Sequence, residues 1–190
     1  MRTRTTTGLI TAGLLLTTGT ACSTSEEPKT VRVTVTQTVT EAPDEQAAPK
    51  KDGPLVLRDK ATVESEDGSS STVEVLAYTH TEKGPEAPGE ALGGDSWATA
   101  EIRVCNAGND SIGVSQDPWS LDYADGTTVE TTGLSGGDMP KPEFPMDKII
   151  SSSKCARGKV AFPVDAKKRP VSVVYGPEGV EPVEWAVPKA

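Results

Sequence analysis

Short runs rich in β-branched residues, separated by Gly, Pro, Asn and Asp, fill the chain from about residue 54 onwards. Apolar and polar residues alternate around Val73, Val75 and Ala77, and again around Ile102 and Val104. Such alternation is typical of half-buried strands, and no segment shows the period of a helix. The pattern predicts nine strands, at Leu55–Arg58, Ala61–Ser65, Thr72–Thr81, Trp97–Asn106, Trp119–Tyr123, Thr127–Thr131, Gly158–Val164, Val171–Tyr175 and Val183–Val187.

These strands predict a single antiparallel β-sandwich over residues 54–190. Asp125-Gly126 separates two of them and is a strong signal for a hairpin turn. Short strands with frequent turn residues and no helices are the pattern of an all-β sandwich. Because aromatic residues make up only 4% of the chain, we expect the three tryptophans to serve the core rather than a sugar-binding groove.

The N-terminus follows a different pattern, that of a secretory signal peptide. Arg2 and Arg4 precede the apolar run Gly8–Leu16, and the small residues Gly19-Thr20-Ala21 then lead to Cys22. The apolar run has about half of the roughly 20 residues that a membrane-spanning helix needs. The sequence therefore predicts a cleaved leader over residues 1–21 rather than a permanent membrane span.

The small residues before Cys22 resemble the lipobox of bacterial lipoproteins. This resemblance implies cleavage between Ala21 and Cys22 and a diacylglyceryl group on the Cys22 sulfur. Gly19 departs from it, since lipoproteins usually carry a large aliphatic residue at that position. The alternative is an ordinary signal peptide with Cys22 as a stray thiol. The polar stretch Ser23–Pro28 favours lipidation, because it suits a tether behind a lipid anchor.

Residues 22–53 are predicted to form a disordered tether, since they are rich in Thr, Glu, Pro, Ala and Lys and contain no aromatic residue. Within them, Thr30–Thr40 alternates Val with polar residues like a strand. A lone strand is not stable in water. The stretch is therefore either β-prone tether, which we favour, or a strand docked on a sheet edge of the domain.

The charge of the chain restricts its partners. Without residues 1–21 the sequence has 17 basic and 28 acidic residues, a formal net charge of −11. A chain this acidic is repelled by nucleic acid and by anionic lipid head groups. We therefore expect no nucleic-acid partner, and attachment to the membrane through the lipid on Cys22.

The chain has three cysteines, an odd number for an exported protein. If Cys22 carries lipid, Cys105 and Cys155 remain as a pair in a compartment where disulfides persist. Closing the loop between them would stabilise the fold by roughly 4 kcal/mol. Two buried free thiols are the alternative. The cysteines lack CxxC spacing, which leaves no redox motif or zinc knuckle.

One segment has the form of a catalytic motif. Gly133–Gly137 (GLSGG) fits the G-x-S-x-G elbow of serine hydrolases, but that site needs a histidine later in the chain, and His80, the only histidine, comes earlier. An order of His80, Asp110 or Asp122, and Ser135 leaves too little chain between base and nucleophile for a two-barrel protease. Ser135 is therefore predicted not to be a nucleophile, and we expect no catalytic residue.

Metal binding is not expected either. Cu(I) could be held by His80, Met139 and Met146, but their spacing follows no known rule, and such methionines usually fill gaps in a core. The acidic residues do not follow the EF-hand pattern for calcium, although weak, nonspecific contact stays open. Those considered are Asp122 with Asp125, and Glu64, Glu66 and Asp67. We expect no metal or other cofactor.

Four successive stretches of the domain together carry a resemblance to a known family: SWATAEIRVCNAGNDSIGV, WSLDYADGTTVE, RGKVAFPVD and PVSVVYG. They resemble an immunoglobulin-like domain of unknown function carried by bacterial lipoproteins. In that family a strand ending in Asn-x-Gly leads to an Asp-Gly hairpin, and a later Gly opens a Val-rich strand. The matching residues are Asn106, Gly108, Asp125, Gly126, Gly158, Val160 and Phe162. The resemblance implies an immunoglobulin-like β-sandwich and is silent on activity.

The sequence thus favours a lipid-anchored protein on the extracytoplasmic face of the cell membrane. We expect a binding or envelope-accessory module rather than an enzyme. Its partner would be another envelope protein, a wall component or a small ligand. The alternative is a structural or antigen-like surface lipoprotein with no discrete ligand.

Overall fold

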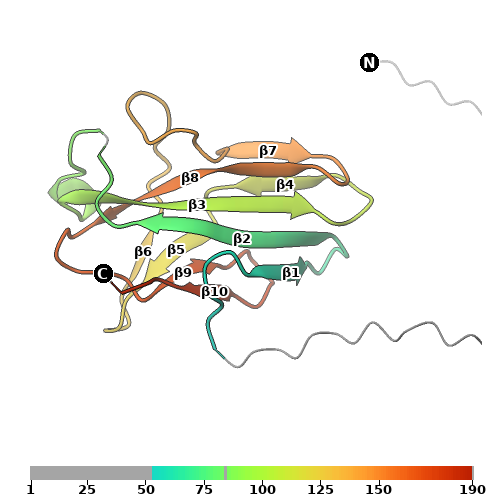
Figure 1. The fold of residues 1–190 in the computed structure, drawn as a ribbon. Coiled ribbons are helices and arrows are strands. Elements are labelled where there is room, and N and C mark those ends of the chain that lie inside the picture. The colour runs from blue at the N-terminus through green and yellow to red at the C-terminus, as the bar shows by residue number, and fades with distance from the viewer. Residues whose placement is uncertain (1–52, 84, 190) are drawn as a thin grey trace, which may run out of the picture. The chain divides into compact units, whose positions relative to one another are not determined.

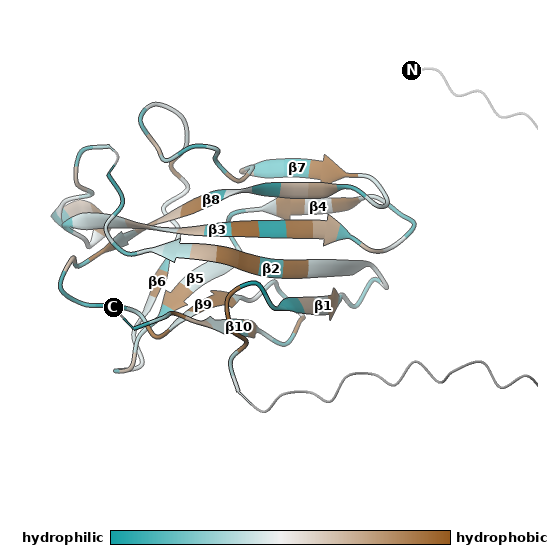
Figure 2. Ribbon diagram, in the orientation of Figure 1, coloured by the Kyte–Doolittle hydropathy of each residue, from teal (hydrophilic) through white to brown (hydrophobic). Residues whose placement is uncertain are grey.

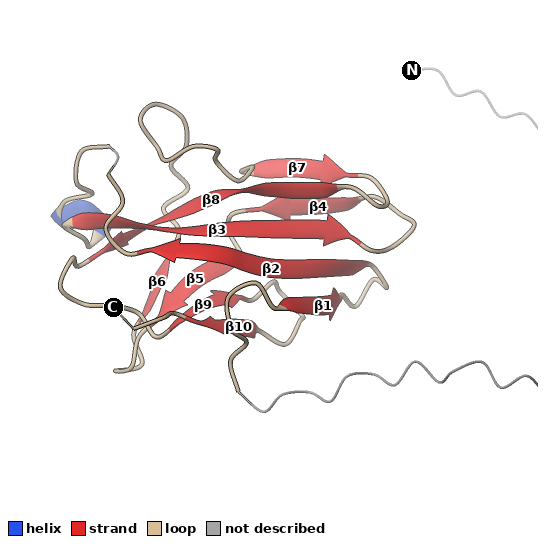
Figure 3. Cartoon of the chain, viewed as in Figure 1, coloured by secondary structure: helices blue, strands red, loops and turns tan. Residues whose placement is uncertain are grey.

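The computed structural model describes residues 53–83 and 85–189, which form ten strands and one short 3₁₀ helix (Figure 1). The strands are β1 Lys60–Glu64, β2 Ser70–Thr79, β3 Ser96–Asn106, β4 Ile112–Ser115, β5 Trp119–Asp122, β6 Thr128–Glu130, β7 Asp147–Ile150, β8 Cys155–Val164, β9 Ser172–Tyr175 and β10 Val183–Ala186. The 3₁₀ helix, Glu90–Leu92, lies in the connection between β2 and β3. Loops make up the rest of the described chain (Figure 3).

The strands pair antiparallel in three sheets. The first sheet has the order β1-β2-β3-β8, the second has the order β10-β9-β5-β6, and β4 pairs with β7. The chain passes from the first sheet to the second between β3 and β5, and again between β8 and β9. This arrangement confirms the predicted all-β, immunoglobulin-like antiparallel β-sandwich.

The core lies between the two four-stranded sheets, because their strands turn alternate apolar residues inward. Figure 2 shows these residues as brown segments along β2 and β3. Both sheets and one loop supply the largest fully buried side chains, which include Trp119, Trp185, Phe144, Phe162, Ile102, Leu121, Val73 and Val75. The ring of Trp119 lies 4.7 Å from that of Tyr175 and 6.1 Å from that of Trp185, measured between centroids. Two of the three tryptophans expected in the core therefore lie in the central core, and Trp97 packs in a separate cluster.

A β-bulge interrupts the alternation predicted for β2. The register with β3 shifts between Val75 and Ala77, so that Leu76 is the extra residue. After a bulge the side chains change faces. Tyr78 consequently packs against the core, whereas Ala77 and Thr79 are exposed. The expectation that Val73, Val75 and Ala77 share one face was wrong at Ala77.

Two strands were not predicted, and one predicted strand began too late. β4 and β7 have four residues each, too few for the alternation of a strand to be recognised. β8 begins at Cys155 rather than at Gly158, so this glycine lies inside the strand instead of opening it. Arg157 and Lys159, near the start of the strand, point outward from the sheet. This part of the sequence therefore lacks the apolar residues by which a strand is recognised.

Leu55–Arg58 was predicted as a strand but only bridges the two sheets. The backbone of Leu55 donates to Glu184 O and accepts from Ala186 N, both at 2.8 Å, along the edge of β10. Three residues later the N–H of Arg58, at a φ of 76°, donates to Val75 O of β2 at 2.8 Å. A left-handed residue cannot continue a strand, and here it carries the chain from one layer to the other.

Gly158 allows a loop to cross the inner side of β8. A Cβ at this position would lie 2.3 Å from Phe144 N and 2.4 Å from Glu143 C. The loop is held there by two backbone hydrogen bonds of Lys159, which donates to Pro142 O at 2.7 Å and accepts from Phe144 N at 2.9 Å. This crossing places the Phe144 ring, 1% exposed, in the core.

The Asn-x-Gly motif has a structural role at the end of β3. Asn106 is 2% exposed, and its Nδ2 donates to Asp110 O at 2.6 Å and to Ile150 O at 3.1 Å. Its Oδ1 accepts from Gly108 N at 2.9 Å. A single buried amide thus closes the turn after β3 and holds the end of β7.

Candidate functional site

Several predicted features lie outside the described residues. They are the signal peptide over 1–21, the lipidation site Cys22, the stretch Thr30–Thr40 and all but the last residue of the tether over 22–53. The domain predicted for residues 54–190 is described apart from residues 84 and 190. In this part of the chain, no helix is long and apolar enough to cross a membrane.

Cys105 and Cys155 form the predicted disulfide, with their Cα atoms 4.0 Å apart. They are direct partners in the register of β3 and β8, so the bridge joins neighbouring strands of one sheet rather than the two layers. Val104 and Ala156 point into the core, and the two cysteines therefore point outward. Cys155 is exposed and Cys105 is half-buried.

A row of charged residues lies next to the disulfide on this outer face. Lys60, Glu74, Arg103 and Arg157 are successive cross-strand partners on β1, β2, β3 and β8, and we call them the charged row. Glu74, only 3% exposed, forms an ion pair with Arg103. Arg157 forms an ion pair with Glu101, with Nη2 and Oε1 separated by 2.8 Å.

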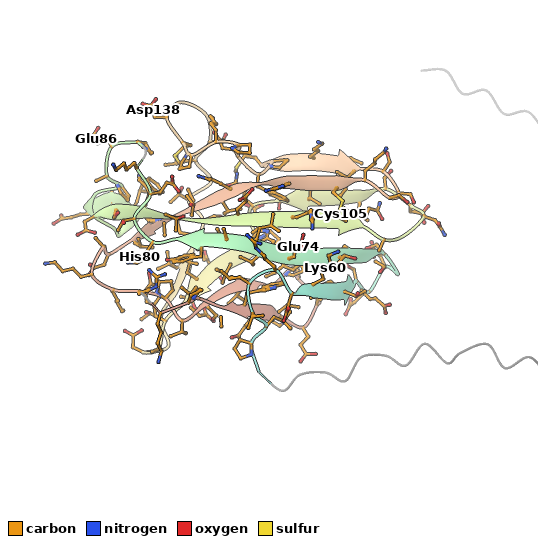
Figure 4. All side chains as sticks on the ribbon, viewed as in Figure 1. Lys60, Glu74, His80, Glu86, Cys105 and Asp138 are labelled. Carbon is orange, nitrogen blue, oxygen red and sulfur yellow. A yellow bond between two sulfur atoms is a disulfide. The ribbon has the colours of Figure 1, made fainter. Side chains whose placement is uncertain are left out.

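A hollow of about 230 Å³ opens between the charged row and the disulfide. Its lining residues are Lys60, Thr72, Glu74, Arg103 and Cys105. Figure 4 labels Lys60, Glu74 and Cys105 on three neighbouring strands. The sequence analysis missed this site, because its members are far apart in the chain and only the strand register brings them together.

The other end of the same face is covered by two loops. Trp97 points outward from β3 and packs with Met139 and Ala161 in a small second cluster. The Trp97 Nε1–H donates to Glu86 O at 3.0 Å, which holds the loop between β2 and β3 at the edge of the ring. Met139 therefore has a packing role in this structure, the role considered in the sequence analysis as the alternative to copper binding.

A tyrosine–histidine cluster lies at one end of the sandwich, away from the disulfide (Figure 4). The Tyr78 hydroxyl is 2.9 Å from Nδ1 of His80, and the guanidinium of Arg169 lies 5.3 Å from the Tyr78 ring centre. Burial raises the pKa of Tyr78 and that of Tyr123 above the ordinary value of a phenol. Lys168 lies 4.9 Å from the centre of the Tyr123 ring.

The remaining candidates from the sequence lie in loops or at the end of a strand. Ser135 is exposed on the loop between β6 and β7. The carboxylate of Asp122 accepts from Thr128 Oγ1 at 2.6 Å. Hydrogen bonds from Lys168 and Thr127 lower the pKa of Asp125, and those from Ser69 lower that of Asp67. Among residues 53–83 and 85–189, no group of three His, Cys, Asp or Glu side chains is placed to hold a metal ion.

Comparisons with known proteins identify the fold alone. No family model matches the chain, and no curated protein does. The structure is similar to MPT63, a secreted protein of Mycobacterium tuberculosis, with a TM-score of 0.55 and 17% identity over 72% of this chain and 100% of that one. It is also similar to the yjhA protein of Bacillus subtilis, with a TM-score of 0.50 and 14% identity over 69% and 98%. The described domain thus shares its β-sandwich fold with a secreted protein.

Proposed function

We propose that this protein is a lipid-anchored extracytoplasmic binding module, which presents the outer face of its first sheet to an envelope partner. The signal-peptide pattern before Cys22 supports export. The Cys105–Cys155 disulfide suits an oxidising compartment, and the fold is shared with a secreted protein. No catalytic step forms part of the proposal.

The charged row is the observation that carries the binding role. Three of its four members, Lys60, Arg103 and Arg157, are cations. Glu74 and Glu101 pair with the two arginines, so the row and its partners keep a net charge of +1 (3 − 2) in a chain of formal net charge −9. The guanidinium group of arginine is planar and holds its donors in a fixed geometry that suits carboxylate and phosphate groups. The partner proposed here is therefore an envelope protein or wall polymer that presents such anionic groups to the sheet.

Lipidation of Cys22 is the first part to test. Cys22→Ala is expected to move the protein from the membrane fraction to the medium, or to leave it unprocessed, because the remaining sequence offers no electrostatic attraction to the membrane. Fractionation and mass analysis of the N-terminus measure this. Unchanged membrane retention with a normally cleaved N-terminus would contradict the proposal.

Binding of an anionic partner to the charged row is tested with the variant Arg157→Glu in the full-length anchored protein. We expect photo-crosslinking from this face in native envelopes to give a discrete product with the wild type, and at least tenfold less with the variant, because the reversed charge repels an anionic partner. Lys148→Glu on β7 makes the same change of charge elsewhere and is expected to retain the product. The absence of any discrete product would favour the alternative, a structural or antigen-like lipoprotein.

A further inference from the structure

We propose that the Cys105–Cys155 bridge undergoes thiol–disulfide exchange in the folded protein, with Cys155 as the site at which a small thiol becomes attached. The exchange does not depend on partner binding, although members of the charged row line the hollow beside Cys105. Three observations lead to it: the bridge lies on the outer face, its two sulfurs differ in access, and Cys105 borders a hollow that suits a thiolate.

Access favours Cys155 as the sulfur that is attacked. Cys155 is exposed at the first position of β8, whereas Cys105 is half-buried within β3. Exchange depends on which disulfide sulfur the incoming thiolate can reach. Because both side chains point away from the core, an external thiol reaches Cys155 without separating the sheets.

The surroundings of Cys105 favour it as the leaving group. Cys105 lines the hollow together with Lys60, Arg103 and Thr72. Nearby cations lower the pKa of a thiol, and a thiol of lower pKa leaves faster in exchange. Glu74 lines the same hollow and forms an ion pair with Arg103, so these two charges offset each other and Lys60 gives the hollow its net positive charge. Thr72 is the direct cross-strand partner of Cys105, so its hydroxyl lies on the same face as the thiolate.

The step is a simple exchange in which one disulfide replaces another. The thiolate of a low-molecular-weight thiol attacks Sγ of Cys155, and a new sulfur–sulfur bond forms as the Cys105–Cys155 bond breaks. The electron pair of the broken bond leaves on Sγ of Cys105, which remains a thiolate or takes a proton from water. The products are a mixed disulfide on Cys155 and a free thiol at Cys105.

The strands remain paired after this step. β3 and β8 are in register from Ser96 with Val164 as far as the two cysteines, which form the last pair. The backbone of Asn106 donates to Lys154 O at 2.9 Å just beyond them. The ladder on both sides of the bridge is therefore independent of the sulfur–sulfur bond, and the attached thiol extends into solvent.

Reduced glutathione is the probe for the native protein, with samples quenched at intervals by iodoacetamide. We expect peptide mapping to find glutathione on Cys155 and the alkyl group on Cys105, while circular dichroism stays that of the folded protein. The rate should rise in proportion to the glutathione concentration. A rate that is independent of concentration would mean that unfolding must come first, and glutathione mainly on Cys105 would mean that the assignment of the two sulfurs is wrong.

A charge variant tests the role of the hollow. Lys60→Gln is expected to slow the exchange about two- to fivefold, since one exposed charge changes a neighbouring ionisation by a modest amount. Lys148→Gln removes a lysine from β7 instead and is expected to leave the rate unchanged. Equal rates for wild type and both variants would overturn the stabilisation of the Cys105 thiolate by Lys60.

Discussion

Replacing both bridge cysteines, as Cys105→Ala with Cys155→Ala, is expected to lower the free energy of unfolding by about 4 kcal/mol. The bridge closes a sequence separation of 50 residues, and its loss releases that loop in the unfolded chain. Four strands lie in the loop, β4, β5, β6 and β7, and none has more than four residues. Strands this short have little stability of their own. The domain therefore depends strongly on the bridge, which lowers the entropy of this loop in the unfolded chain.

Urea unfolding followed by tryptophan fluorescence measures this loss, since Trp119 and Trp185 are fully buried. Reductant should lower the midpoint of the wild type towards that of the double variant and leave the double variant unchanged. An oxidised wild type that unfolds at the same urea concentration as the double variant would contradict the prediction.

Gly158→Ala is expected to destabilise the domain by about 3 kcal/mol, which is at the upper end for an overpacked core. The added methyl group would lie 2.3 Å from a backbone nitrogen, and a backbone atom cannot move aside as a flexible side chain can. Relief of the clash requires the loop at Phe144 to leave β8. That movement would weaken the two hydrogen bonds of Lys159 and withdraw the Phe144 ring from the core.

Gly113→Ala is the matched control for this substitution. Gly113 also lies in a strand, β4, and the nearest atom to an added Cβ is the end of the Ile149 side chain at 3.9 Å. The change should leave stability within about 1 kcal/mol, with a small gain from the stiffer unfolded chain. Thermal unfolding of the two variants would refute the argument if both had the same midpoint.

The β-branched alternation was enough to predict the fold class, because each long strand contributes one apolar face to the core. β3 illustrates this well: Ile102 and Val104 are buried, and Arg103 between them points outward. The hairpin at Asp125-Gly126 was equally local, since Gly126 has a φ of 82° and Asp125 Oδ1 accepts from Thr127 N at 3.2 Å. Both features depend on residues that are neighbours in the sequence.

The rest could not be predicted because it depends on contacts between distant residues. The bulge at Leu76 and the left-handed turn at Arg58 are local in shape, but neither residue type requires them. Gly158 was expected to open a strand, but a glycine is needed here because a loop that begins sixteen residues earlier, at Pro142, crosses the strand at this point. The hollow beside the disulfide depends on the pairing of three strands, which composition and spacing do not specify.

The segment around Leu55 determines how the domain would bear mechanical load. It runs parallel to β10, so tension between the chain before Gly53 and the chain after β10 acts along this segment and β10 in opposite directions. Such tension shears the two hydrogen bonds of Leu55 together instead of unzipping them in turn. The bonds from Arg58 N to Val75 O and from Trp185 Nε1 to Asp59 O, at 2.8 and 3.0 Å, then share the force. A pull transmitted through the predicted tether would thus be resisted at this junction before it reached β1.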